Sequence, residues 1–364
     1  MTLRETLGRL SNAHGVSGSE GSVHDILRSE LAGSVDGIRT DALGNLIAVK
    51  KGGRFSVMIA SHMDEIGLMV NYIDDRGFIR FVTFGGWYAP TLYNQRVVLH
   101  GTKGPVTGVV GGKPPHVMDE EERKKGVKAE NMFIDAGASS AKEVAGLGIE
   151  IGTPVTVDRE LAGLAGKRVT GKAFDNRAGC AVLVEVLKKL KSPHTVYGVF
   201  TVQEEVGTKG AKTSSFALDP DCAIALDSTF PGDHPDIDKK DSCLEMGKGP
   251  AITVSDANGR GLIADRRMVA WLRKVADAKK IPYQLEVGHG GTTDASSIHL
   301  SRAGIPSTVV SVPVRYIHSP VEVADLRDME ASAKLLLEAL KGNPKGISPR
   351  ENRRGEASVE KPAL

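Results

Sequence analysis

Two adjacent glutamates, Glu204 and Glu205, follow an apolar run in the stretch VYGVFTVQEEVGTKGA. The run from Val196 to Val202 is rich in β-branched and aromatic residues, which predicts a buried strand. Successive side chains on a strand point to opposite faces, so a strand alone cannot direct both carboxylates into one site. Gly207 and Gly210 follow at once, and we expect them to form a turn. The sequence therefore predicts two carboxylates presented together at the tip of a buried strand.

Polar side chains also stand at the ends of three other predicted strands. They are His62 and Asp64 after SVMIA, Asp227 after CAIAL, and His318 after STVVSVPV. In open α/β sheets ligands bind outside the carboxyl ends of the strands, so we expect these side chains to meet there. Asp175, in KAFDNRAGC, precedes a predicted helix and either joins this group or caps the helix.

Each of these residues alone has a plain structural interpretation. An isolated His-x-Asp is usually a loop pair, Asp227 a turn residue, and His318 a hydrogen-bonded loop histidine. Their joint occurrence favours another explanation, because carboxylates buried at the tips of apolar strands are costly without counter-charge. The same segments contain little Lys or Arg that could pair with all of them.

Divalent metal ions would supply the missing positive charge. The charges of two such ions are balanced by three carboxylates and one hydroxide, with two histidines as neutral ligands. We expect one carboxylate to bridge the two ions. We expect Asp64 to accept a hydrogen bond from His62 and so to orient its ring, as metal-bound histidines commonly require. The expected ligands are His62, Asp175, Glu205, Asp227 and His318.

The composition limits the classes of partner. The formal charge of +2 is the difference between 47 basic and 45 acidic residues, which gives no electrostatic case for nucleic acid or an anionic membrane. Cys180, Cys222 and Cys243 form no CxxC pair, which favours reduced thiols. Because no apolar segment reaches transmembrane length, we expect a cytoplasmic protein that acts on diffusible substrates.

The pattern of elements predicts an α/β fold that is interrupted by a β module. The α/β parts have helix patterns near 22–31, 176–191, 262–279 and 324–341, and strand patterns at 46–50, 56–60, 196–202, 222–227 and 307–314. From Gly67 to about Gly163 the texture changes to short alternating strands with frequent glycine. Within this module the charged stretch 114–128 is expected to be a surface loop.

These patterns predict a discontinuous domain organisation. Residues 1–66 and 164–342 would form the catalytic α/β domain, and 67–163 an inserted β domain. The polar, Pro- and Gly-punctuated residues 343–364 would form a disordered tail.

The motifs in these segments resemble those of one known family. They are SHMDEIG, GGW with QRV, AFDNRAGC, VQEEVGTKGA, ALDST, GGTTDAS and IHSPVEV, in the family order. The chain resembles the tetrahedral (TET) aminopeptidases, dinuclear metallopeptidases that include glutamyl and deblocking aminopeptidases, some of which were formerly labelled endoglucanases. The resemblance covers Leu3 to about Leu340.

The resemblance implies a zinc-peptidase catalytic domain with a mixed sheet and a small inserted β-barrel-like domain. It also implies a role for each candidate residue. His62 and Asp227 would bind one metal ion, Glu205 and His318 the other, Asp175 would bridge both, and Glu204 would be the general base. Zinc or cobalt is the expected metal. The inserted domain would mediate dimerisation, and the dimers would assemble into a hollow tetrahedral dodecamer.

The sequence therefore predicts a metal-dependent aminopeptidase that removes N-terminal residues from short peptides with a free N-terminus. Two alternatives stay open. A related dinuclear carboxypeptidase or deacylase shares the His-x-Asp, Asp, Glu-Glu, Asp, His skeleton, although the inserted module favours the aminopeptidase. A catalytically silent shell protein is the other, although a structural metal site has no use for Glu204.

The loop after Asp227 is a candidate for substrate selection. Its acidic residues Asp233, Asp236 and Asp238 would attract basic side chains of a substrate or be merely solvated.

Overall fold

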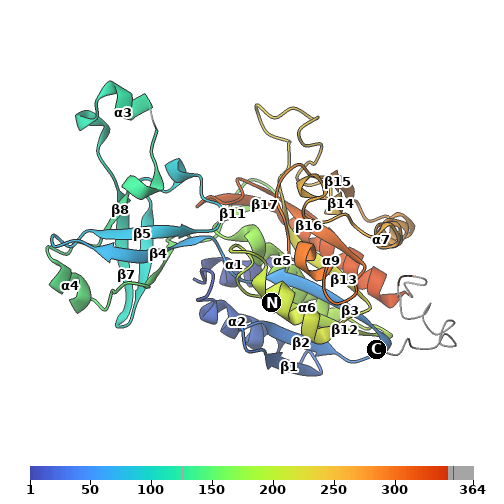
Figure 1. Cartoon of the computed structure of the whole chain (residues 1–364). Coiled ribbons are helices and arrows are strands. Elements are labelled where there is room, and N and C mark those ends of the chain that lie inside the picture. Colours follow the sequence, from blue (N-terminus) through green and yellow to red (C-terminus); the bar gives the residue numbers. More distant parts are fainter. Residues whose placement is uncertain (125, 343–346, 348–364) are drawn as a thin grey trace, which may run out of the picture.

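The computed structural model describes residues 1–124, 126–342 and 347 (Figure 1). The predicted tail, 343–364, lies outside the described residues apart from residue 347. An α/β body carries a smaller β-barrel that projects from one side, so the predicted fold class is confirmed. None of the helices in the described part of the chain is long and apolar enough to cross a membrane.

An eleven-stranded mixed sheet forms the centre of the α/β body. Its strand order is β1-β2-β12-β3-β13-β16-β17-β11-β10, with β14 paired to β16 and β15 paired to β14. The strands β12, β3, β13 and β16 are parallel, so their carboxyl ends meet at one edge. The strands are β1 (Gly37–Thr40), β2 (Leu46–Lys50), β3 (Gly53–His62), β10 (Ala162–Gly163), β11 (Arg168–Gly171), β12 (His194–Thr201), β13 (Cys222–Thr229), β14 (Ala251–Ser255), β15 (Gln284–Val287), β16 (Ser307–Arg315) and β17 (Glu322–Asp325).

Helices cover both faces of this sheet, which explains why its central strands are apolar at nearly every position. On β3, Val57 and Ile59 belong to the main core, whereas Met58 and Ala60 pack in a second cluster on the opposite face. The main core includes side chains of α1 (Leu3–Asn12), α2 (Gly21–Leu31), α5 (Phe174–Lys189), α7 (Arg266–Lys279) and α9 (Leu326–Lys341). The second includes side chains of α6 (Lys209–Leu218) and α8 (Ala295–Ile298).

The inserted segment forms a closed antiparallel barrel in the order β4-β5-β8-β7-β6-β9. It has a hydrophobic core of its own, which includes Leu68, Val97 and Ile134. Its strands are β4 (Gly67–Ile73), β5 (Ile79–Phe84), β6 (Arg96–Gly101), β7 (Gly104–Gly111), β8 (Phe133–Asp135) and β9 (Pro154–Val157). Its helices are α3 (Glu120–Lys124), α4 (Ala141–Gly146) and the 3-10 turns η1 (Ala89–Thr91), η2 (Pro115–Val117) and η3 (Ala129–Asn131); η4 (Ala257–Gly259) lies in the α/β body.

Some local expectations were wrong. The stretch 114–128 is not only a loop, because it contains η2 and α3. Gly207 has φ +117 and lies in the turn after β12, but Gly210 lies inside α6. A Cβ at Gly210 would stand 2.6 Å from the backbone of Val202, so glycine is needed there for close packing rather than for the turn.

Candidate metal centre

The parallel strands place the candidate residues at one edge of the sheet. His62 is the last residue of β3, Asp227 lies near the end of β13, and Glu204 and Glu205 follow β12. His318 follows β16 after a short turn. Asp175 comes from the first turn of α5, whose regular helical dihedral angles begin only after Asn176. The N-cap residue of α5 is Ala173 and Asp175 lies inside the helix, so the alternative that Asp175 caps the helix does not apply.

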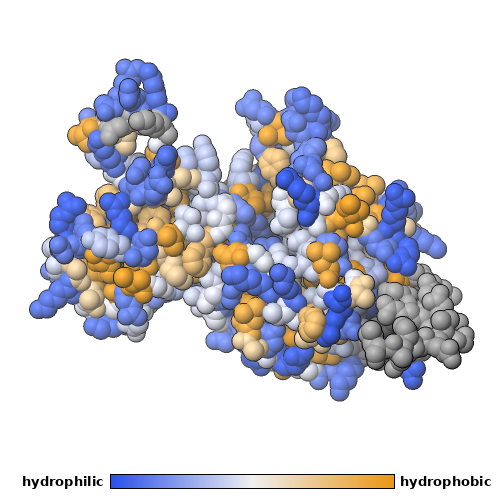
Figure 2. Space-filling model, viewed as in Figure 1, coloured by the Kyte–Doolittle hydropathy of each residue, from blue (hydrophilic) through white to orange (hydrophobic). Residues whose placement is uncertain are grey.

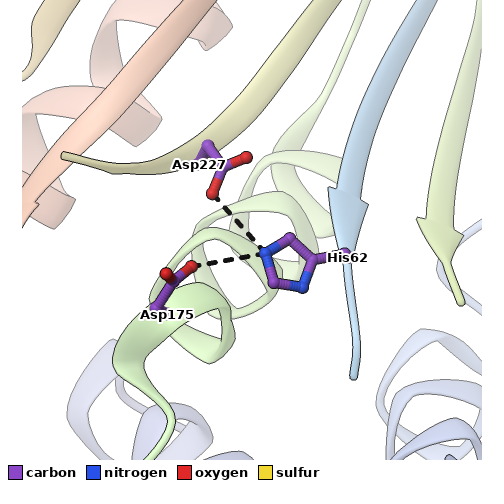
Figure 3. A group of neighbouring side chains, drawn as sticks. All are labelled: His62, Asp175 and Asp227. Carbon is purple, nitrogen blue, oxygen red and sulfur yellow. Dashed lines mark ion pairs between the residues drawn. The ribbon is translucent and has the colours of Figure 1, made fainter. Parts of the chain in front are cut away.

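Asp175 lies between the two histidines and turns one carboxylate oxygen toward each. The Nε2 atom of His62 lies 3.3 Å from Asp175 Oδ1 and 3.6 Å from Asp227 Oδ1 (Figure 3). The Nε2 atom of His318 lies 3.3 Å from Asp175 Oδ2 and 3.3 Å from Glu205 Oε2. The structure thus forms two groups of three potential ligands that share Asp175.

The surroundings of these groups favour positive charge. Burial lowers the pKa of His62, but Asp175, Asp227 and Asp64 outweigh it and raise that pKa well above its ordinary value. Burial likewise acts against the charged form of His318, yet the carboxylates of Asp175 and Glu205 raise its pKa to about 11. In the absence of metal ions, both imidazole rings would therefore be protonated. Binding of divalent ions would displace these protons.

The donor atoms fit divalent metal ions. Each group offers one imidazole nitrogen and two carboxylate oxygens, a set that suits zinc and neighbouring transition metals. Glu205 Oε1 is buried and has no hydrogen-bond partner in the described part of the chain, which an ion would remedy.

The second ring nitrogen of each histidine faces an acceptor that leaves Nε2 free for a metal ion. His62 Nδ1 lies 3.3 Å from the backbone oxygen of Asp64 and 3.5 Å from Asp64 Oδ1. His318 Nδ1 lies 3.0 Å from the backbone oxygen of Gly86, in the segment that follows β5 of the barrel. With Nε2 bound to metal, Nδ1 would be protonated and would donate a hydrogen bond to these oxygens.

Asp64 also holds the turn that carries the two glutamates. Its carboxylate accepts hydrogen bonds from the backbone amides of Glu204 at 3.0 Å and Glu205 at 3.2 Å, and from the Ser17 hydroxyl at 2.6 Å. This bonding explains how neighbouring carboxylates after one strand both reach the site. Gln203, just before them, has φ +55, which turns the chain out of the strand.

Glu204 belongs to neither group of potential ligands, although it lines the same cavity. Its Oε2 atom lies 3.9 Å from His62 Nε2. Burial raises the pKa of Glu204 well above its ordinary value; His62 opposes the shift, while Asp227 and Asp294 add to it.

Sequence reasoning missed Glu322, which ties two of the candidate ligands together. Its buried carboxylate accepts hydrogen bonds from the backbone amides of Asp175 at 2.9 Å and His318 at 3.0 Å. The only signal in the sequence is its place four residues after His318 in IHSPVEV. Because it bonds backbone rather than side chains, no ligand pattern includes it.

The centre opens into a cavity of about 720 Å³. Its walls include Phe230, Leu244, Thr253 and the loop 287–293. Such a volume admits the terminal residue of a peptide with its neighbours.

Comparisons with known proteins agree with this geometry. The model of the family described as M42 glutamyl aminopeptidase matches residues 44–335. An aminopeptidase structure from the archaeon Desulfurococcus kamchatkensis is 42% identical, with a TM-score of 0.90 and coverage of 95% of this chain and 96% of that chain. Lysyl aminopeptidase of Pyrococcus furiosus is 37% identical, with coverage of 93% of this chain and 97% of the relative.

A third relative adds information on assembly. The Pyrococcus horikoshii TET1 peptidase, which can assemble into a tetrahedron or a large octahedral shell, is 32% identical. Its TM-score is 0.85, with coverage of 94% of this chain and 100% of that chain. The resemblance to TET aminopeptidases in the motifs is thus confirmed, and the chain belongs to the M42 glutamyl aminopeptidase family of peptide hydrolases.

Proposed function

We propose that this aminopeptidase acts with two divalent ions per chain. In this proposal His62 and Asp227 hold one ion, His318 and Glu205 hold the other, and Asp175 is shared. The observation that carries the proposal is the position of Asp175, whose two oxygens each lie 3.3 Å from the Nε2 atom of a different histidine. The family implies divalent metals, and the mixed nitrogen and oxygen donors favour zinc or cobalt.

The chemistry of the bound ions would be to polarise the scissile carbonyl and to make water a nucleophile near neutral pH. Glu204 would act as the general base, since its carboxylate faces the cavity and is not needed in either ligand group. It would take a proton from the attacking water and return it to the leaving amine. Burial raises the pKa of Glu204, which favours the protonated form that returns the proton to the leaving amine.

The substrates would be short peptides with a free N-terminus. A free α-amine is positively charged, and the cavity beside the centre is lined with carboxylates. An acetylated N-terminus lacks this charge and is bulkier. The family is described as glutamyl aminopeptidase and one relative is a lysyl aminopeptidase, so the preferred terminal residue differs within the family and depends on the lining of the cavity.

We also propose that the chain forms a homo-oligomer, a dodecamer built from dimers, with the barrel at the dimer contact. Large apolar side chains are exposed on the barrel, including Tyr72, Tyr88, Val117 and Ile151, and Figure 2 shows hydrophobic residues on its surface. Surfaces of this kind often mark protein contacts. The shell formed by the related TET1 peptidase supports the same assembly.

The proposed domain limits are 1–66 with 164–342 for the catalytic domain and 67–163 for the barrel. The separate hydrophobic cores of the two parts support these limits. A cytoplasmic location belongs to the same proposal, because the three cysteines are free thiols.

Metal content and N-terminal selectivity together test the proposed function. The purified chain is stripped with a chelator and reloaded, and turnover of a peptide is compared with that of its N-acetylated form. We expect two ions per chain, turnover only after reloading, and far slower cleavage of the acetylated peptide. Equal turnover of both peptides would favour a deacylase or an endopeptidase instead, and full activity without metal would contradict the mechanism.

A further inference from the structure

The cavity has more negative charge than the metal centre uses. None of the described residues that line it is Lys or Arg. Of its carboxylates, Asp175, Glu204, Glu205 and Asp227 lie at the centre, where two divalent ions would balance them. Three more carboxylates, those of Asp241, Asp256 and Glu286, line the cavity outside the centre. Their charge remains for a substrate to balance.

Glu286 is a fixed carboxylate without a cationic partner in the described part of the chain. It lies on β15, opposite Thr253 of β14, and Thr253 donates a hydrogen bond to Oε2 at 2.7 Å. The hydroxyl of Thr229, at the end of β13, donates to Oε1. Both donors are neutral, and a carboxylate can accept about four hydrogen bonds, so Glu286 can still accept bonds from a ligand.

The charges around Glu286 are negative as well. Burial raises its pKa, the two threonine hydroxyls oppose the shift, and the carboxylates of Asp256 and Asp227 raise the pKa further. An unpaired carboxylate in such a place is costly, and a cation entering the cavity would relieve that cost.

Asp256 is a second carboxylate of the cavity wall whose hydrogen-bonding capacity is not filled among the described residues. It follows β14, is only 6% exposed, and accepts a bond from the Leu262 amide through Oδ1. Its Oδ2 atom is buried and has no hydrogen-bond partner among the described residues. Together with Glu286, it makes this wall of the cavity negative.

The acidic residues that the sequence suggested for this task, Asp233, Asp236 and Asp238, do not line the cavity. Asp233 forms an ion pair with Arg315 at 2.8 Å and also accepts the Met246 amide. Asp238 pairs with Lys240 at 2.9 Å and is not among the residues that line the cavity.

Apolar side chains line the same cavity, among them Phe230, Leu244 and Ile317. Lysine and arginine have an apolar stem and a charged head, so they need both kinds of surface. A glutamate side chain in the cavity would meet Glu286 and Asp256 with like charge, which is unfavourable.

We infer that this cavity prefers peptides whose N-terminal residue is basic, lysine or arginine, and that Glu286 sets the preference by binding the charged end of that side chain. The inference rests on the aminopeptidase function and adds the substrate class. The metal centre would hold the terminal peptide bond, while residues of the paired strands β14 and β15, labelled in Figure 1, line the part of the cavity that selects the side chain.

The test compares kcat/KM for p-nitroanilides of lysine, arginine, norleucine, leucine and glutamate with the metal-loaded full chain. Norleucine has the lysine stem without the ammonium group, so the ratio of lysine to norleucine measures the value of the charge without any mutation. We expect this ratio to be at least about tenfold, with glutamate cleaved slowest. Glu286→Gln should reduce the ratio by about tenfold or more at unchanged metal content.

Asp238→Asn is the matched control, because it removes an exposed carboxylate near the cavity that does not line it. Its lysine to norleucine ratio should equal that of the wild type. A wild type that cleaves leucine, norleucine or glutamate as fast as lysine would overturn the inference but leave the aminopeptidase function intact. An equal loss on every substrate in Glu286→Gln would also overturn it, since Glu286 would then serve the α-amine or the metal centre. Failure of the loaded wild type to cleave any of the substrates would overturn the function itself.

Discussion

The carboxylate of Asp64 accepts a hydrogen bond from the backbone amide of Glu204 at 3.0 Å. The same carboxylate lies 3.5 Å from His62 Nδ1 and accepts the amide of Glu205. One buried side chain therefore connects a candidate ligand on β3 with both glutamates after β12. The position of Glu204, the proposed base, relative to the candidate metal centre depends on this connection.

Asp64→Asn should weaken metal binding and turnover without removing any ligand. An asparagine offers only one acceptor oxygen, so one of the amides that Asp64 binds would lose its partner. We expect a loss of roughly 10–100-fold in metal affinity or in kcat, the usual range for a residue that orients a ligand. Titration of the stripped variant with zinc, followed by turnover at saturating zinc, separates the two effects. A zinc affinity and a kcat equal to those of the wild type would show that this hydrogen-bonded connection contributes neither to metal binding nor to turnover.

The barrel contributes directly to the position of His318. The backbone oxygen of Gly86 lies 3.0 Å from His318 Nδ1, and a Cβ at Gly86 would stand 2.9 Å from the same atom. Gly86→Ala should therefore displace His318 and reduce the affinity for one of the two ions, by roughly 10–100-fold. Elemental analysis after dialysis at limiting zinc would show the loss.

Gly8→Ala is the control for this substitution. A Cβ at Gly8 has no neighbour within 4 Å, and the residue lies inside α1. Alanine there should stabilise the chain by about 0.5–1 kcal/mol and leave metal content unchanged. If Gly86→Ala bound both ions as tightly as Gly8→Ala, the barrel would have no part in positioning His318.

The strands that carry the candidate ligands could be predicted from the sequence, because each is an apolar run. Polar residues that follow parallel strands meet at one edge of the sheet, which fixes where they lie. His62 and Asp227 therefore lie where the pattern placed them. The metal roles of these residues remain predictions. The contacts of Glu322 and Gly86 could not be predicted, since the Glu322 carboxylate accepts from backbone amides and Gly86 offers its backbone oxygen, and the sequence does not mark backbone partners.

Some elements were also missed for physical reasons. The segment of α6, KGAKTSSFAL, contains glycine, serine and threonine, which have low helix propensity, and its packing against β12 stabilises it instead. The inserted β module was easier to predict, because short alternating strands separated by glycine-containing turns are a clear sequence signal. Its closure into a barrel was expected from the family resemblance alone.

Acid should weaken the junction between the barrel and the α/β body. His14, after α1, bonds Thr156 of β9 at 2.7 Å, and its ring lies 4.8 Å from that of His100 on β6. Burial and the nearby Lys172 lower the pKa of His14 to about 4. A histidine with a lowered pKa stabilises the fold above its unfolded pKa of about 6.5, and this contribution is lost as the pH falls from there toward 4.

The variant His14→Gln isolates this effect, because glutamine can still bond Thr156 but does not titrate in this range. Urea midpoints of metal-free wild type and variant are measured at pH 7.5 and pH 5. We expect the wild type to lose more stability than the variant between these values. The same loss in both proteins would mean that other groups cause the acid sensitivity.

The last prediction separates the two adjacent glutamates by substitution. Glu204→Gln keeps the size and hydrogen bonding of the side chain but removes the base, so both ions should stay bound while kcat falls by roughly 10²–10⁴-fold. Glu205 Oε2 lies 3.3 Å from His318 Nε2, and Glu205→Gln would remove the charge of this ligand. We expect that variant to lose the ion shared with His318, and its activity with it, because a neutral amide binds a divalent ion less strongly than a carboxylate does.

His318→Ala is the companion to Glu205→Gln, since both remove a ligand from the same group and should give the same metal content. Metal per chain by elemental analysis is set beside peptide turnover for each variant. Loss of metal in Glu204→Gln with both ions retained in Glu205→Gln would reverse the assignment of the pair. Unchanged turnover in both would remove the metal-assisted mechanism altogether, because the two carboxylates that β12 and Asp64 bring to the centre would then do no chemistry there.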